Sequence, residues 1–185
     1  TQRAQPETAM YPFLRMIKVM AKARRQPPLG LFDTHESTLI CWPWDLDPWV
    51  ELNNGRTLTL YDLGRLPLSR RTGFEQLLRD RQWGLTVAGS TTRYRKRVTM
   101  FSRLTMQTRC LGWDDRFVYM EQSMWKGDDC TSHVLIRSAI VSKAGMVKPA
   151  DMATAMGIAP QSPPLPDWVT AWILAEATRP WPPAR

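Results

Sequence analysis

The sequence predicts an α+β fold in which a long helix lies against an antiparallel sheet. Residues 56–65 and 73–82 carry apolar residues at helical spacing, with Leu60 and Leu63 in the first segment. After residue 82 the period changes to two, and Met106 and Cys110 alternate with polar residues such as Gln107 and Arg109. This alternation is typical of a half-buried antiparallel strand.

The remaining elements follow from local signals along the chain. Residues 1–9 are expected to be a loose terminus, and 11–25 an amphipathic helix with Phe13 and Ile17 on one stripe. β-Branched and aromatic residues over 36–42 predict a strand. Pro149 suits the first position of a short helix, and Gly157 suits its C-terminal cap. The predicted strands are 36–42, 84–97, 99–110, 117–125 and 131–142, with hairpin turns at 112–116 and 126–129, and a last helix at 167–177.

Length and composition favour a single globular domain with extensions. The 185 residues are 43% hydrophobic and 23% charged, which argues against disorder of the whole chain. We expect an N-terminal arm over 1–30, the main domain over 31–145 and a helical extension over 146–185. No apolar stretch is long enough to span a membrane, and basic residues interrupt the apolar N-terminal run, so a cytoplasmic location is expected.

The positive charge is concentrated near the N-terminus. The net charge is +8, and residues 1–30 hold six basic residues and one acid, 6 − 1 = +5. Such an arm could meet nucleic acid, an anionic membrane surface or a phosphorylated ligand. For the helix at 11–25, packing on its own domain and lying on a membrane are both open, and packing is slightly favoured because the apolar stripe is short.

Several chemistries lack their usual signatures. Cys41, Cys110 and Cys130 form no CxxC pair, and the two histidines have no metal-binding spacing, so we expect reduced thiols, no metal and no cofactor. A GxSxG elbow and a glycine-rich phosphate loop are both absent, which disfavours a serine hydrolase and an NTPase.

The loop before the long helix carries three carboxylates, Asp45, Asp47 and Glu51, in tryptophan-rich surroundings. Crowded like charges raise the pKa of a carboxylate, which can then act as a general base or a nucleophile. A helix N-terminus follows at once, and its free N–H groups can polarise a carbonyl oxygen. Helix capping and turn formation explain the same residues without any chemistry, and from this loop alone they are favoured.

A family resemblance shifts that balance towards chemistry. The run D45-L-D47-P-W-V-E51-L-N53-N54, with YDLGR at 61–65 and the stretch 93–122, resembles the 4-hydroxybenzoyl-CoA thioesterase-like branch of the hot-dog superfamily over residues 33–145. The resemblance implies a sheet wrapped around one helix and hydrolysis of an acyl-CoA thioester. It matches Asp47 to the catalytic carboxylate, and Asn54 or Gly55, next to Asn53, to the place where a backbone N–H meets the thioester carbonyl. Glu51 stands where the motif has histidine, and the motif tyrosine is replaced near Thr57.

The resemblance also implies partners. A homodimer or a dimer of dimers is expected, with the site built across the interface, and acyl-CoA as substrate. Arg93, Arg95 and Arg97 alternate in the predicted strand and as a cluster could hold the phosphates of coenzyme A, although a solvated strand face is the favoured explanation for any one of them. A non-catalytic acyl-CoA-binding protein stays open because the motif histidine is lost. A nucleic-acid-binding module is a weaker alternative, and nucleic acid is not an expected partner.

Overall fold

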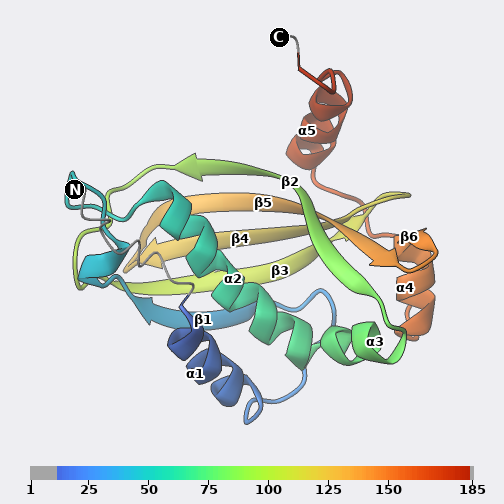
Figure 1. Ribbon diagram of the computed structural model, residues 1–185, viewed down its shortest axis with the longest axis horizontal. Coiled ribbons are helices and arrows are strands. Elements are labelled where there is room, and N and C mark those ends of the chain that lie inside the picture. Colours follow the sequence, from blue (N-terminus) through green and yellow to red (C-terminus); the bar gives the residue numbers. More distant parts are fainter. Residues whose placement is uncertain (1–11, 184–185) are drawn as a thin grey trace, which may run out of the picture.

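The computed structural model describes residues 12–183, in which an antiparallel sheet curls around the long helix α2 (Figure 1). The expected loose terminus at 1–9 and Tyr11 of the expected first helix lie outside the described residues. The helices are α1 (Phe13–Ala23), α2 (Asn54–Arg71), α3 (Phe74–Asp80), α4 (Pro149–Ala155) and α5 (Asp167–Ala177). The strands are β1 (His35–Ile40), β2 (Gly84–Tyr94), β3 (Arg103–Trp113), β4 (Val118–Lys126), β5 (Asp129–Ser142) and β6 (Gly145–Val147). This is the α+β hot-dog architecture, with additional helices at both ends.

The strands run in the order β1-β3-β4-β5-β2, and each neighbouring pair is antiparallel. β1 and β2 are the edges of this path, while the short β6 pairs with β5. The strand that follows α2 therefore crosses to the edge opposite β1, and the two hairpins β3–β4 and β4–β5 form the middle of the sheet.

α2 lies on the sheet at very close range. Leu60, Tyr61 and Leu63 are fully or almost fully buried against it. A Cβ atom at Gly64 would come within 2.5 Å of the Thr108 hydroxyl, so only glycine fits there. The buried amide of Gln122 on β4 donates to the carbonyl oxygen of Tyr61 at 2.8 Å, which satisfies a polar group inside an otherwise apolar contact.

The two terminal extensions pack on different sides of this body. α1 rests on the core through Met16 and Val19, and its Ala23 is buried. α5 packs on β4 and β5 through the buried Val169, and Figure 1 shows it extending beyond the sheet. None of the described helices is long and apolar enough to cross a membrane.

Several expected boundaries were wrong. α2 runs from 54 to 71 instead of 56–65, because the helix continues through Pro67, whose side chain is buried on its core face. β2 ends at Tyr94 instead of residue 97, since the N–H groups of Arg95 and Lys96 both turn to the carbonyl oxygen of Thr131. β3 starts at Arg103 instead of 99 because residues 99–102 form a turn, in which Met100 is exposed.

Candidate active site

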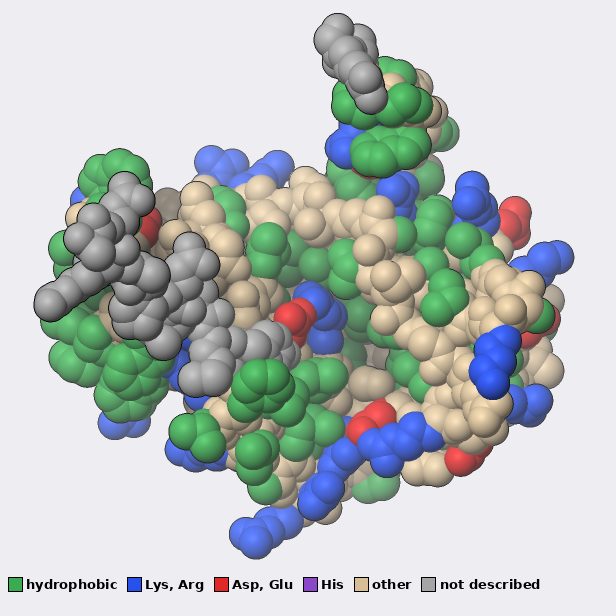
Figure 2. Space-filling model, viewed as in Figure 1, with side chains coloured by type: hydrophobic (Ala, Val, Ile, Leu, Met, Phe, Trp, Pro, Cys, Tyr) green, Lys and Arg blue, Asp and Glu red, His purple; other side chains and the backbone are tan. Residues whose placement is uncertain are grey.

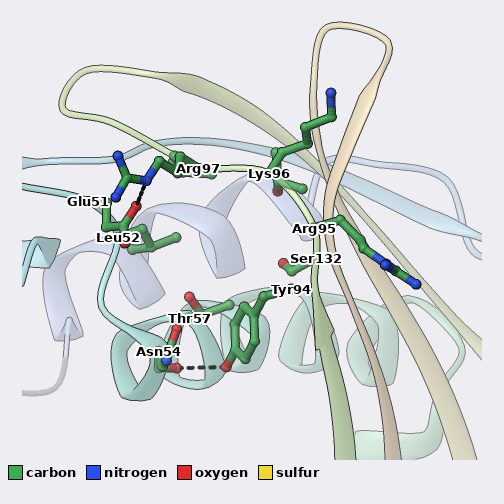
Figure 3. A pocket seen from close by; sticks show the side chains of 11 residues that line it. Glu51, Leu52, Asn54, Thr57, Tyr94, Arg95, Lys96, Arg97 and Ser132 are labelled. Carbon is green, nitrogen blue, oxygen red and sulfur yellow. Dashed lines mark hydrogen bonds and ion pairs between the residues drawn. The ribbon is translucent and has the colours of Figure 1, made fainter. Parts of the chain in front are cut away.

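A pocket of about 210 Å³ opens at the N-terminus of α2, and we call it the helix pocket. Three segments line it: the end of the loop before α2, the first turn of α2, and the chain that leaves β2, with β5 at its back. Figure 3 shows how these side chains face one another. Its lining residues are Glu51, Leu52, Asn54, Thr57, Tyr94, Arg95, Lys96, Arg97, Val98, Thr131 and Ser132.

Glu51 is the carboxylate that lines the helix pocket. A carboxylate oxygen of Glu51 lies 2.7 Å from Nε of Arg97, and the Glu51 side chain is 28% exposed. A backbone bridge from Glu51 to Thr99 holds the two segments together. The partly exposed carboxylate is therefore accessible to water, and the backbone bridge to Thr99 holds the segment that carries it.

Asp47 lies four residues earlier and does not line the helix pocket. Its Oδ1 accepts the N–H of Trp49 at 2.9 Å, and a longer contact of 3.4 Å joins it to the N–H of Glu51. The N–H of Asp47 in turn donates to the carbonyl oxygen of Glu51 at 2.8 Å. Asp47 thus closes the turn that presents Glu51, as the capping interpretation of this loop anticipated.

Asp45 is the buried member of the carboxylate triplet. Its side chain is 0% exposed, and it pairs with Arg15 at 2.7 Å and with Arg56 at 2.8 Å. It also accepts the N–H of Trp42 at 2.9 Å. Two cations and a backbone donor occupy both oxygens, so Asp45 joins α1, the loop and α2 instead of serving the pocket.

The first turn of α2 lies beside the helix pocket, which Asn54 and Thr57 line. Asn53 caps the helix, since its Oδ1 accepts the N–H of Arg56 at 3.0 Å, and Asn54 lines the pocket directly after it. The first N–H groups of a helix have no partner within the helix, and they carry its positive dipole end. Asn53 and Gly55 do not line the pocket, but both belong to this turn.

The basic run is divided by the end of β2. Arg93 lies within the strand opposite His133 and does not line the pocket, whereas Arg95 and Arg97 do. Figure 3 shows Arg97 turned towards Glu51, and Arg95 pointing away from Glu51 and Asn54. The three arginines therefore do not share one strand face, because the strand ends before Arg95.

Several polar side chains of the helix pocket are absent from the set of site residues expected from the sequence. The Tyr94 hydroxyl donates to the carbonyl oxygen of Asn54 at 3.2 Å, and burial raises its pKa, which keeps the hydroxyl protonated. Thr57, Lys96, Thr131 and Ser132 are the others. A tyrosine at the end of a strand carries no local signal of function, and its contact with α2 depends on how β2 crosses the sheet.

The comparisons with known proteins agree with this fold. The family model described as the thioesterase-like superfamily matches residues 41–173. The Xenopus laevis protein THEM6 is 32% identical over 163 residues, which cover 87% of this chain and 78% of that protein. Among solved structures, a DHNA-CoA thioesterase from Staphylococcus aureus has a TM-score of 0.57 at 10% identity, covering 78% of this chain and 91% of that one. The Staphylococcus aureus protein SAV2348 in complex with CoA also has a TM-score of 0.57 at 10% identity, covering 76% and 94%.

The two solved structures support the fold alone at that identity, whereas the family model and the THEM6 relative span most of the chain. The match begins at Cys41, directly before the carboxylate loop, and it includes α2, β2 and the whole helix pocket. The chain therefore belongs to the thioesterase-like superfamily.

Proposed function

We propose that this protein hydrolyses an acyl-CoA thioester at the helix pocket, by carboxylate-assisted attack of water. The observation that carries the proposal is the convergence of Glu51, the first turn of α2 and cationic residues on one pocket. Thioester hydrolysis needs a base for water, donors for an oxyanion and a site for an anionic leaving group. Release of free thiol from acyl-CoA substrates tests the proposal directly.

The two carboxylates of the turn have different proposed roles. Glu51 lines the pocket and takes the proton of the attacking water, at the position where the family motif has histidine. Asp47, matched by resemblance to the catalytic carboxylate, acts with Glu51 by closing the 47–51 turn and adding a second negative charge beside it. Arg97 contacts Glu51 and balances part of this negative charge until an anionic ligand binds Arg97.

The thioester carbonyl is proposed to meet the N-terminus of α2. The backbone N–H groups of Asn54 and Gly55 lie in the first turn, where no carbonyl group of the helix can accept them. Asn53 fixes the start of the helix through its cap, so these donors keep a constant direction. Preorganised donors of this kind stabilise a tetrahedral intermediate more than the planar thioester.

The phosphates of coenzyme A are proposed to bind at the rim formed by Arg95, Lys96 and Arg97. Arg95 and Arg97 are exposed, so they can contact a ligand without first leaving a buried partner. Arg93, which lies within β2 before the rim, adds positive charge nearby. The protein SAV2348, which shares this fold, was solved in complex with CoA.

We further propose that two copies pair through the exposed edge of β2, giving a homodimer or a dimer of dimers. Within residues 12–183, β2 pairs with β5 on one side only, and Leu85 and Val87 on it are 38% and 53% exposed. An unpaired strand with exposed apolar side chains is a template for pairing with a second strand. The helix pocket lies at the end of β2, so a partner there would extend its walls.

A peripheral membrane contact through residues 11–25 is proposed as well. α1 packs with Met16 and Val19, but it leaves Phe13, Leu14 and Ile17 at 53%, 84% and 60% exposure. The apolar stripe through Phe13 and Ile17, for which packing on the domain was slightly favoured, thus faces outward. Figure 2 shows apolar side chains gathered over α1 and over the end of the molecule that carries the loop before α2.

The neighbouring loop adds tryptophans to the same region. Trp44 and Trp49 are 65% and 74% exposed, and the Arg15 guanidinium lies 5.9 Å from the centre of the Trp44 ring. Lys18, Lys22 and Arg24 are exposed on α1. Apolar and tryptophan side chains beside lysines and arginines are typical of helices that lie on anionic membranes.

A further inference from the structure

A second cavity, of about 530 Å³, lies between α1 and the strands β1 and β3, and we call it the α1 cavity. None of its lining residues belongs to the helix pocket. Its apolar wall includes Val19, Leu39, Leu63, Leu104 and Met106. Its volume is in the range of small-molecule binding sites, which are mostly apolar with a few convergent polar groups.

Three buried polar atoms on residues of this cavity have no hydrogen-bond partner within residues 12–183. They are Nη1 of Arg15, Nε2 of His35 and Oγ of Ser37, and all three residues line the α1 cavity. His35 is 2% exposed and Ser37 is 8% exposed, and both face the same side of β1, since they are two residues apart. Buried donors without acceptors are rare, and three around one cavity indicate a missing acceptor.

The hydrogen bond at Nδ1 of His35 determines which ring nitrogen carries the proton. Nη1 of Arg71 lies 2.9 Å from Nδ1 of His35, and a guanidinium can only donate, so Nδ1 accepts. Burial and the charges of Arg71 and Lys22 lower the pKa of His35 to about 4, so the ring is neutral at neutral pH. A neutral ring that accepts at Nδ1 must carry its proton at Nε2, which makes the unpartnered atom a donor.

The charged residues around the α1 cavity are mostly cationic. Arg15, Lys18, Lys22 and Arg103 line it, against one carboxylate, Glu36. The two lysines come from α1, whereas His35 and Ser37 come from β1, so the donors approach from two sides. An apolar wall, neutral donors and surplus positive charge together match an apolar chain that ends in an oxyanion.

We propose that the α1 cavity binds an amphiphile whose head is an oxyanion, a carboxylate or a phosphate ester, and whose tail is an aliphatic chain. The head accepts hydrogen bonds from His35 Nε2 and Ser37 Oγ near the lysines of α1, and the chain lies along Val19, Leu39 and Met106. This site is separate from the helix pocket, so it does not depend on the proposed hydrolysis.

Isothermal titration calorimetry of the full chain tests this site with four probes below their micelle concentrations. These are dodecanoate, dodecyl phosphate, dodecanol and dodecyltrimethylammonium. We expect one site for an oxyanion probe and at least about tenfold weaker binding of dodecanol, the loss typical of buried polar groups left unpaired. The tighter of the two oxyanions identifies the head group.

Variants locate the binding. Val19→Trp fills the cavity, and Lys18→Gln with Lys22→Gln removes exposed charge without touching the core. Both variants are expected to bind dodecanoate or dodecyl phosphate about tenfold more weakly, or weaker still. Lys143→Gln, in the exposed turn after β5, is the matched control, and Glu51→Gln is expected to bind like the wild type.

The site is overturned by equal affinity for the oxyanion probes and dodecanol, or by oxyanion binding that neither cavity variant weakens. Absence of binding for both oxyanions does the same. Because Glu51→Gln alters only the helix pocket, a loss of hydrolysis with retained oxyanion binding separates the failure of one proposal from that of the other.

Discussion

Glu51 and Arg97 join the loop before α2 to the chain leaving β2, with 2.7 Å between the Glu51 carboxylate and Nε of Arg97. The Arg97 side chain is 77% exposed, so solvent screens the pair, and it contributes on the order of 1 kcal/mol or less to stability. A contact that costs so little to open can be exchanged when an anionic ligand binds Arg97. The ion pair therefore fits a ligand-responsive rim better than a structural brace.

Asp45 provides the contrasting case of a structural carboxylate. Asp45→Asn leaves Arg15 and Arg56 facing a neutral amide in a buried position, and we expect a loss of about 3–5 kcal/mol in the free energy of unfolding. Urea denaturation followed by far-UV circular dichroism measures this change. Asp33→Asn, in an exposed turn, is the control, and equal losses for the two variants would remove Asp45 from its proposed bracing role.

His35 predicts a dependence of stability on pH. Its pKa is lowered from 6.5 to about 4 in the folded chain, so between these values the unfolded chain binds more protons. The sign follows: stability rises with pH across this window, and it falls as the pH drops below 6.5. From pH 7 to pH 5 the expected loss due to His35 is about 2 kcal/mol.

The matched variant for this prediction is His35→Asn, whose amide oxygen can still accept from Arg71. The difference in unfolding free energy between wild type and variant is expected to shrink by about 2 kcal/mol from pH 7 to pH 5. Urea titrations at both pH values measure it. A difference that stays constant with pH would show that His35 does not titrate in this way.

The edge of β2 predicts the state of association. Sedimentation velocity is expected to show a dimer or larger assembly for the wild type, and Val87→Glu is expected to shift it towards monomer by placing a charge on the edge strand. Lys126→Glu, on the β4–β5 hairpin, is the control. A wild-type monomer, or an assembly that Val87→Glu leaves intact, contradicts pairing through β2.

The exposed face of α1 predicts binding to anionic membranes. Vesicles with phosphatidylserine should retain the protein in flotation experiments, and neutral vesicles or high salt should release most of it. Leu14→Ser with Ile17→Ser is expected to abolish retention, because both side chains are exposed and neither stabilises the fold. Leu174→Ser on α5, where the leucine is also exposed, is the control. Retention of the α1 variant on anionic vesicles would show that the exposed face of α1 does not bind the membrane.

The sequence predicts the fold well because the spacing of apolar residues along the chain follows the buried side of each helix or strand. The bounds of α5 agree with the expected 167–177, and the alternation through Met106 and Cys110 matches the buried side of β3. Boundaries failed where tertiary contacts decide them. The carbonyl oxygen of Thr131 ends β2 by taking two N–H groups, and it lies 36 residues from Arg95 along the chain, 131 − 95 = 36.

The candidate site was predicted less completely than the fold. The loop and the start of α2 were singled out correctly as neighbours, but local sequence does not show that Asp45 is buried, that Asp47 closes a turn, or that Glu51 faces the pocket. Tyr94 and Ser132 reach the pocket only through the sheet order. The α1 cavity has no sequence signal, because its donors come from α1 and β1 and meet only in the folded chain.

The most direct test of the proposed hydrolysis is release of free thiol from short, long and aromatic acyl-CoA substrates by wild type, Asp47→Asn and Glu51→Gln. Wild type is expected to hydrolyse at least one class of substrate. The kcat of Glu51→Gln is expected to fall about 10²–10⁴-fold, and the kcat of Asp47→Asn is also expected to fall. The circular dichroism of both variants is expected to match that of the wild type. Lys143→Gln is the control. If wild type binds these compounds and hydrolyses none, the protein is a non-catalytic acyl-CoA-binding member of its family; if both variants keep full activity, the helix pocket is not the active site.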